Sequence, residues 1–467
     1  MKKYLFSIAI LLGVVSCTQD FENINTNPNE PITVSGDLLL RSAIFDLSNL
    51  LVSETYGFTD IVAQYTANYE FNQLDIYNWT SDSRFWYLYD YLQDVKDVKR
   101  YGSENELPNY EAVALILEAF SYSILTDAYG DVPFSESNQA EVGVLSPVYD
   151  TQASIYGNIL AQLEQANQLI DESSSIEGDL LYGGDMHKWR KFANSLRVRL
   201  LMRTSNVQNV SAALQAIVDN PAQYPVFESI DDNAVYYYSG VTPDISPYSS
   251  GLGREYEYYL GIPSTHFVNL LLENSDPRIE EWLDEHEKED GILEYIGTAP
   301  GQDQGDIGRP GDFASKDASY FYDPAKISAI FMPFSELNFL FAEAAHRNII
   351  GGEAADWYEA GVQAAFEEWG VTMPDEFLSV AVPFDENNLF EQKWLALYHC
   401  GMEAWFDWKR TGKPDFIQAG PGNVNNGQVP VRLMYPSLEQ SVNATNYQAA
   451  SQRIGGDNIN TRVWWDK

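Results

Sequence analysis

The sequence has little positive charge and almost no cysteine. Its 467 residues include 28 Lys and Arg against 68 Asp and Glu, which gives a formal net charge of −40 at pH 7. Such a surface repels the phosphate backbone of nucleic acids and anionic lipid headgroups, so no nucleic-acid partner is expected. With 45% hydrophobic residues, the chain can nevertheless bury a sizeable core.

The sequence also lacks the motifs of common enzyme classes. It contains no GxSxG, no P-loop and no GxGxxG, so we predict no catalytic residue and no cofactor. A secreted glycoside hydrolase remains an alternative, because the 68 acidic residues could supply a carboxylate pair by chance. The histidines are scattered, without an HExxH or CxxC motif, and are expected to be structural: His187, His266, His286, His346 and His399.

A calcium site is conceivable in one acidic loop, although no metal site is predicted. The spacing of the aspartates there is not that of an EF-hand. The residues are Asp303, Asp306, Asp312 and Asp317.

The N-terminus is typical of a bacterial lipoprotein signal peptide. Lys2 and Lys3 precede a mostly apolar stretch, 4–15, that is too short to span a bilayer as a helix. The next residues, VVSC, resemble a lipobox, so we predict a signal peptide at 1–16 and lipid attachment to Cys17. An ordinary signal peptide followed by an incidental cysteine is the alternative. The polar stretch that follows is expected to form an irregular tether at 17–35.

Lipid on Cys17 would leave Cys400 as the single thiol. No intramolecular disulfide can then form, and Cys400, in the apolar run WLALYHCGMEAW, is predicted to be a small core residue. Residues 18–22, TQDFE, resemble the acidic signal that directs many Bacteroidetes lipoproteins to the cell surface. We therefore expect an outer-membrane protein, anchored by lipid, that faces the cell exterior and has no later membrane-spanning segment.

The body of the chain has the pattern of paired helices. Several segments place apolar residues at three- and four-residue steps without interior proline, as amphipathic helices do. In sequence they form four hairpins of about 34 residues, which predicts an all-α fold of tetratricopeptide-like units. Trp394 and Trp405 are expected in the core of the last pair. The predicted helices span 82–99, 110–128, 151–170, 187–202, 335–348, 355–369, 386–400 and 402–409.

A stretch of different character, 206–331, separates the second helix pair from the third. It is rich in Tyr, Gly, Pro, Ser and Asp, so we expect loops with short strands or helices. Its acidic part, 280–290 (EEWLDEHEKED), is expected to be a solvated helix face. Long irregular insertions are usually functional or disordered, and the aromatic content argues against disorder. We therefore predict that this insertion forms the recognition face.

Aromatic side chains are the strongest indication of a ligand. Sugar rings have apolar C–H faces that stack on aromatic rings, while amides and carboxylates bind the hydroxyls. Rings at helical spacing, such as Trp86 and Tyr89, are expected in the core, whereas both roles stay open for the 30 tyrosines where they cluster in loops. Tyr237 and Tyr259 belong to the same cluster as the candidates. The candidate ligand-binding residues are Trp79, Tyr236, Tyr238, Tyr248, Tyr256 and Tyr258.

Several segments, in this order behind a lipobox, resemble the SusD/RagB family of outer-membrane nutrient-binding lipoproteins from Bacteroidetes. Read for themselves, they look like helix ends and turns, and therefore like scaffold. They are SILTDAYGDVPFSES (123–137), FSELNFLFAEAAHR (334–347), EQKWLALYHCGMEAWFDWKRTGKPDF (391–416), VRLMYPSLEQSVN (431–443) and NTRVWWD (460–466).

The resemblance implies a lid. Family members pack four tetratricopeptide-like units against a variable loop-rich subdomain, cap a SusC-like TonB-dependent transporter and help to deliver an oligomeric nutrient to it. The cargo is usually an oligosaccharide and in some members a peptide, and no chemistry is performed on it. The ligand contacts lie in variable loops, so no family site residue is transferred to this chain.

A single SusD-like domain is therefore expected at 36–467. It comprises helical repeat pairs at 82–204 and 334–410, the variable ligand-binding insertion at 206–331 and a C-terminal wrap at 411–467. A peptide-binding member of the same family and a periplasmic helical-repeat scaffold are the remaining alternatives.

Overall fold

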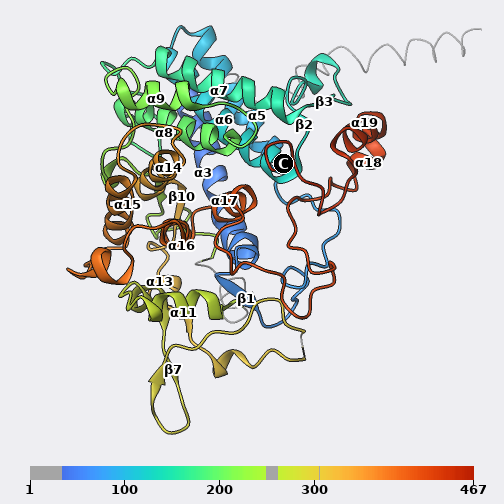
Figure 1. The fold of residues 1–467 in the computed structure, drawn as a ribbon. Helices are drawn as coiled ribbons and strands as arrows, with labels where there is room; N and C mark the ends of the chain where they lie inside the picture. Colours follow the sequence, from blue (N-terminus) through green and yellow to red (C-terminus); the bar gives the residue numbers. More distant parts are fainter. Residues whose placement is uncertain (1–33, 249–260, 304) are drawn as a thin grey trace, which may run out of the picture.

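The computed structural model describes residues 34–248, 261–303 and 305–467 (Figure 1). The predicted signal peptide, Cys17 and most of the tether lie outside these residues, and so do Tyr256 and Tyr258. The described chain is mainly α-helical, which confirms the predicted fold class.

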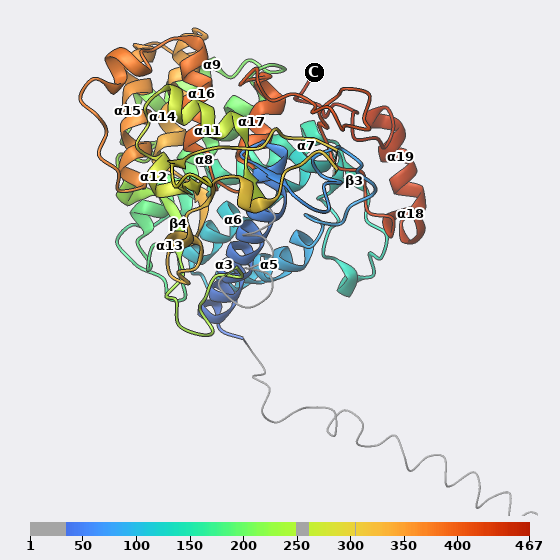
Figure 2. The ribbon, with the colours of Figure 1, turned by 90° about the horizontal axis from the view of Figure 1, so that it is seen from below.

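The first half of the body is a layer of antiparallel helices. Neighbours in sequence pack on one another, and the first long helix, which the sequence pattern had not indicated, lies along α5 (Figure 2). Thr151 and Asp185 cap the third and fourth predicted helices by accepting hydrogen bonds from backbone N–H groups of the first turn. The helices are α3 (Gly36–Glu54), α5 (Leu88–Glu104), α6 (Pro108–Tyr129), α7 (Gln152–Leu169) and α8 (Met186–Thr204).

Helix α6 is the most apolar of the long helices in this layer. It is long and apolar enough to cross a membrane, yet its residues from Ala112 to Tyr129 are all buried, so it is the central core helix of this layer. Pro108 at its first position supplies a helical φ angle without needing a hydrogen-bond partner.

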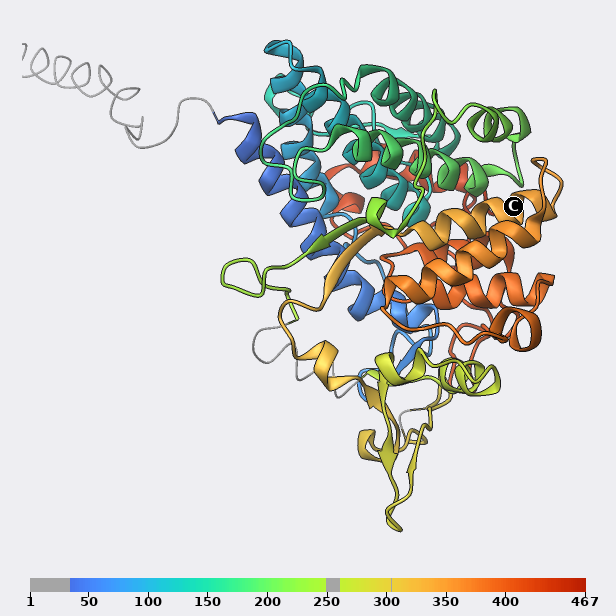
Figure 3. The same ribbon diagram turned by 90° about the vertical axis from the view of Figure 1, so that its left-hand side faces the viewer.

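The second half stacks further helices beside the first (Figure 3). The two halves meet where α8 packs on α14, and a buried ion pair joins Arg199 Nε to Glu336 Oε1 at 2.6 Å across that contact. The helices are α14 (Phe334–His346), α15 (Ala354–Glu368), α16 (Glu386–Ala396) and α17 (Glu403–Thr411).

Buried charges fix α17 against its neighbours. Glu343 of α14 accepts from Arg410 Nη1 at 2.5 Å, and Lys393 of α16 donates to Glu343 at 3.3 Å and to Asp407 at 2.9 Å. The surrounding core includes Trp394 and Trp405, 2% and 0% exposed, and Cys400, so these three predictions are confirmed. Trp86 and Tyr89 are partly buried and pack against the same core.

Short strands and helices fill the space around these layers. The strands form antiparallel pairs, β1 with β5, β10 with β4, β2 with β3, β6 with β9 and β7 with β8. They are β1 (Thr66–Asn68), β2 (Val132–Pro133), β3 (Tyr149–Asp150), β4 (Ala234–Tyr237), β5 (Gly261–Pro263), β6 (Leu283–Asp284), β7 (His286–Glu287), β8 (Leu293–Glu294), β9 (Ser315–Lys316) and β10 (Ser328–Met332). The short helices are α4 (Asp60–Val62), α9 (Ser211–Asp219), α11 (Thr265–Glu273), α12 (Ile279–Trp282), α13 (Ala318–Phe321), α18 (Glu439–Val442) and α19 (Ala444–Ile454), and Thr55–Thr59, Ala140–Val142, Ile230–Asp232, Pro310–Asp312 and Phe377–Ala381 form single π or 3₁₀ turns.

The prediction of a helix face at 280–290 is wrong. Helix α12 ends at Trp282, and the chain continues into the β7–β8 hairpin, which projects from the body (Figure 3). The turn contains Asp290 and Gly291, and Gly291 has φ of +81°. An Asp-Gly pair between strands strongly favours a hairpin, because glycine adopts positive φ without steric cost.

Candidate functional site

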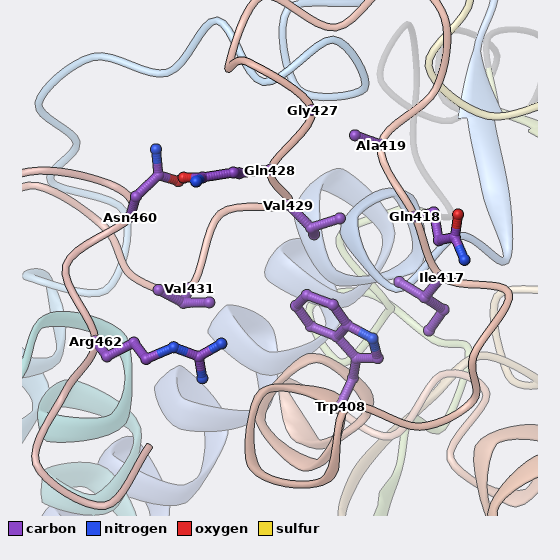
Figure 4. Close-up of a pocket in the computed structure, with 10 residues that line it drawn as sticks. All are labelled: Trp408, Ile417, Gln418, Ala419, Gly427, Gln428, Val429, Val431, Asn460 and Arg462. Carbon is purple, nitrogen blue, oxygen red and sulfur yellow. The ribbon is translucent and has the colours of Figure 1, made fainter. Parts of the chain in front are cut away.

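A pocket of about 490 Å³ lies at the end of α17, among three segments of the C-terminal part of the chain (Figure 4). Its volume is within the roughly 300–1,000 Å³ of typical small-molecule sites. Trp408 projects into it from α17, and the other side chains come from 417–419, 427–431 and 460–462 (Figure 4). The lining residues are Trp408, Ile417, Gln418, Ala419, Gly427, Gln428, Val429, Val431, Asn460 and Arg462.

Trp408 faces the pocket because its neighbours on α17 are bound elsewhere. Asp407 and Arg410 belong to the buried ion cluster with Glu343, and the Lys409 ammonium donates to the Asp127 carbonyl at 2.6 Å. Trp405, one turn earlier, is fully buried, whereas Trp408 is only half-buried. The helix therefore presents one large aromatic ring to the cavity.

Amide groups form the polar wall. Asn460 and Asn425 pair reciprocally, each Nδ2 donating to the other's Oδ1 at 2.8 and 2.7 Å, which holds the 423–428 loop in place. Gln418 Nε2 donates to the Asp415 carbonyl at 2.9 Å. These contacts leave further lone pairs and N–H groups on the amides that a bound hydroxyl group could use.

Among the described residues of the lining, Arg462 supplies the positive charge. Its Nη1 pairs with Asp466 Oδ1 at 2.6 Å, while 60% of the side chain is exposed. Burial raises the pKa of Asp466 to about 6, and burial lowers the pKa of Lys409 beneath the pocket to about 7. Both groups lie below the lining rather than in it.

The described lining of the pocket combines an aromatic ring, amide groups and a guanidinium. Of the described residues that line it, none is an Asp, Glu, His, Cys, Ser, Thr or Tyr. General acid–base and nucleophilic catalysis need such groups within hydrogen-bond reach of the reacting atoms. An aromatic ring beside amides and a guanidinium can instead hold a polyhydroxylated ring by stacking and hydrogen bonding.

Trp79, a residue proposed from the sequence, lies behind this pocket. Its ring packs against Trp405 with centroids 6.0 Å apart, and its Nε1 donates to the Leu74 carbonyl at 3.1 Å. It is only partly exposed, so it supports the α17 region from the core side. The structure therefore brings Trp79 close to the candidate site without placing it in the lining.

The structure packs the described tyrosine candidates into the core. Tyr236 and Tyr238 lie 4.9 Å apart between ring centroids, and Tyr238 donates to Asn49 Oδ1 at 2.9 Å. Tyr236 donates to the Asp244 carboxylate. Tyr248, 9% exposed, lies 4.9 Å from Tyr56 between ring centroids and donates to the Ser53 carbonyl at 3.1 Å.

Strand geometry explains why these neighbouring tyrosines differ in exposure. Successive side chains of a strand point to opposite faces, so Tyr236 and Tyr238 share one face and Tyr237 takes the other. Tyr237 is 67% exposed, whereas Tyr236 and Tyr238 are 5% and 2% exposed. The sequence predicted only loops with short strands or helices here, so it gave no means of telling which of these rings would be buried.

The acidic loop considered for calcium has other roles where it is described. Asp312 accepts from the Arg309 backbone N–H at 2.8 Å, and Asp317 accepts from the Tyr320 N–H at 2.6 Å to cap α13. Within the described ranges, no group of three or more His, Cys, Asp or Glu side chains is arranged to hold a metal ion.

The residues that line the pocket were missed because their segments looked like scaffold. In WFDWKRTG the charged residues suggested an exposed helix end, yet Asp407, Lys409 and Arg410 are buried and the intervening Trp408 meets the cavity. The one available signal was a tryptophan among charges, followed by a loop rich in Gly, Asn and Gln.

The chain resembles known proteins over nearly its whole length. A SusD-like family model, described as starch-binding and associating with the outer membrane, matches residues 28–436. A solved chitin-binding protein is 26% identical, with a TM-score of 0.81 over 93% of this chain and 100% of that one. No curated protein sequence matches at a significant level.

Two SusD homologues share the fold at lower identity. One from Bacteroides fragilis is 24% identical, with a TM-score of 0.79 over 93% of this chain and all of its own. A chitin-binding one from Flavobacterium johnsoniae is 23% identical, with a TM-score of 0.77 over 92% of this chain and 98% of its own.

Proposed function

Because the chain belongs to the SusD-like family, we propose that it binds an oligosaccharide at the outer membrane as a nutrient protein and does not transform it. The observation that carries the proposal is the Trp408 pocket. It combines one large aromatic face with amides and a guanidinium, and its described lining has no acid, base or nucleophile. The starch-binding description of the family and the chitin-binding relative favour a glycan as the ligand.

The proposed cellular role is that of a lid on a transporter. Lipid on Cys17 anchors the protein to the outer membrane, and the protein faces the cell exterior. The lipobox and the acidic residues after it support the anchor and the orientation. The family resemblance supports a SusC-like TonB-dependent transporter as the partner that receives the ligand.

Binding and turnover can be measured on the lipid-free chain, 18–467, which keeps every described residue. Calorimetric titration with starch- and chitin-derived oligosaccharides and with mixed oligopeptides is expected to give saturable binding to one glycan class. Product analysis of the same mixtures is expected to show no cleavage. Binding of peptides alone, or turnover of the glycan, would contradict the proposal.

The pocket itself is tested by Trp408→Ala. Central aromatic contacts of a binding site are typically worth about 2 kcal/mol, so affinity should fall about 30-fold. Trp357→Ala is the matched control, because Trp357 is also half-buried but lies on α15 outside the pocket lining. Equal affinities of the two variants would place the glycan elsewhere.

A further inference from the structure

A second cavity, of about 230 Å³, lies between the β4–β10 pair and the ends of α15 and α16. It shares no lining residue with the Trp408 pocket. It is smaller than the roughly 300–1,000 Å³ of drug-sized ligand sites, so it suits a ligand of about one sugar ring or one amino-acid side chain. The residues that line it come from the insertion and from the second helical half.

Four aromatic rings from separate elements form its walls. Tyr237 comes from β4, Tyr320 from α13, Trp369 from the end of α15 and Tyr398 from the turn after α16. Ring centroids of Tyr320 and Trp369 lie 5.3 Å apart, and those of Trp369 and Tyr398 lie 6.2 Å apart. Aromatic faces carry negative potential, so converging rings attract a cation within about 6 Å of their centroids.

A carboxylate without a cationic partner lies in the same lining. Glu368 accepts from Ser335 Oγ at 2.6 Å, from the Ser335 N–H at 3.1 Å and from Asn233 Nδ2 at 3.3 Å. In the part of the chain that the structure describes, no Lys or Arg forms an ion pair with it. Burial raises the pKa of Glu368 to about 7, which is the effect of a charge that lacks compensation.

The groups around Glu368 do not supply that compensation. Glu336 of α14 and Glu281 of α12 add negative charge on two sides, and the phenols of Tyr237, Tyr320 and Tyr398 have raised pKa values and stay neutral. Lys326 lines the rim, but its ammonium donates to Ser319 Oγ at 3.3 Å. A net charge of −40 further raises the local concentration of cations.

We propose that this cavity binds a primary ammonium group carried by a ligand of about one sugar ring or one amino-acid side chain. The aromatic rings cover the cation, and Glu368 is its counter-ion. The ammonium would form a charge-assisted hydrogen bond to the carboxylate while the rings exclude water around it. A 2-amino-2-deoxy sugar and a lysine side chain both carry this group. The site goes beyond the proposed oligosaccharide function, because it uses a separate cavity and a charge that neutral glycans lack.

The direct test is calorimetric titration at pH 8, where Glu368 is ionised, with three ligands. Glucosamine and Nα-acetyl-lysine amide carry the ammonium, and N-acetylglucosamine is the uncharged match of the first. We expect saturable binding of at least one ammonium ligand and at least 30-fold weaker binding of N-acetylglucosamine. Preference for glucosamine identifies a sugar source, and preference for the lysine amide identifies a peptide source. Equal binding of glucosamine and N-acetylglucosamine, or no binding of any ligand, would overturn the proposal.

Two variants assign the binding to this cavity. Glu368→Gln should weaken it at least tenfold, since the amide can still accept from the Ser335 N–H but carries no charge. Glu367→Gln makes the same change at the exposed neighbouring residue of α15 and should have no effect. If Glu368→Gln does not fold, Tyr237→Ala, at an exposed ring, should weaken binding several-fold with an unchanged melting temperature. Wild-type affinity in both Glu368→Gln and Tyr237→Ala would refute the assignment.

The Trp408→Ala variant separates this site from the oligosaccharide pocket. It should bind the ammonium ligand as the wild type does while losing its glycan. Unchanged glycan affinity in Trp408→Ala would contradict the oligosaccharide pocket and leave the ammonium site standing. Loss of ammonium binding in Trp408→Ala would contradict the separate ammonium site and leave the oligosaccharide pocket standing.

Discussion

Neutralising Glu343 should destabilise the fold strongly, because this carboxylate holds α17 in place. Its side chain is 1% exposed and contacts two buried cations, Arg410 at 2.5 Å and Lys393 at 3.3 Å. Glu343→Gln keeps the shape but removes the charge. Breaking a buried ion pair from one side costs about 3–5 kcal/mol. Asp407 remains within 2.9 Å of both cations, so we expect the lower end of that range, about 3 kcal/mol.

Urea unfolding of the two proteins at pH 7 measures this difference in the free energy of unfolding. Glu359→Gln, the same change at an exposed residue of α15, should lie within about 0.5 kcal/mol of the wild type. A loss below 1 kcal/mol for Glu343→Gln, or an equal loss for the control, would refute the argument that the buried cluster needs this charge.

The pH dependence of the difference gives a second check on the same reasoning. The Arg410 and Lys393 cations hold the pKa of Glu343 well below its usual value of 4.5, despite the opposing effect of burial. A carboxyl with a lowered folded-state pKa stabilises the fold above its unfolded pKa, and this contribution is lost as the pH falls below it. The advantage of the wild type over Glu343→Gln should therefore shrink from pH 7 to pH 3. A constant difference would contradict the assignment.

Three further outcomes follow from the sequence and the structure. Cys17→Ala should leave the melting temperature unchanged, because the residue precedes the first described helix, and should release the protein from membranes; retention after a salt wash would contradict the lipobox. Trp405→Ala should lower the free energy of unfolding by about 3–5 kcal/mol, since the ring is fully buried, and an unchanged urea midpoint would refute this. Burial raises the pKa of Asp75 to about 7, so ionising it costs stability as the pH rises from 3.8 to 7. Asp75→Asn should therefore be more stable than the wild type at pH 8 and show a smaller advantage at pH 5; the same gain at both pH values would contradict the effect of charge.

The helices could be predicted because their signal is local. Apolar spacing and the absence of interior proline placed α6 at 110–128, within two residues of its observed bounds, Pro108–Tyr129. Helix α3 was missed although it is 19 residues long, because it follows the polar tether and its buried residues extend around much of its circumference. The hairpin after α12 was missed because acidic residues dominate 280–290, and a single Asp-Gly turn decides the outcome.

The sequence by itself determined the class of the fold, the core tryptophans Trp394 and Trp405 and the resemblance to the SusD/RagB family. Each depends on patterns that neighbouring residues create along the chain. Only the tertiary structure decided which rings meet a cavity. Trp408 and Arg462 are 54 residues apart in the numbering, and Tyr237 comes from the insertion whereas Trp369 follows α15 of the second helical half, yet each pair lines one cavity. Asp407, Lys409 and Arg410 are buried because they bind partners on other helices. Their charges alone suggested solvent exposure, since those partners are distant in sequence.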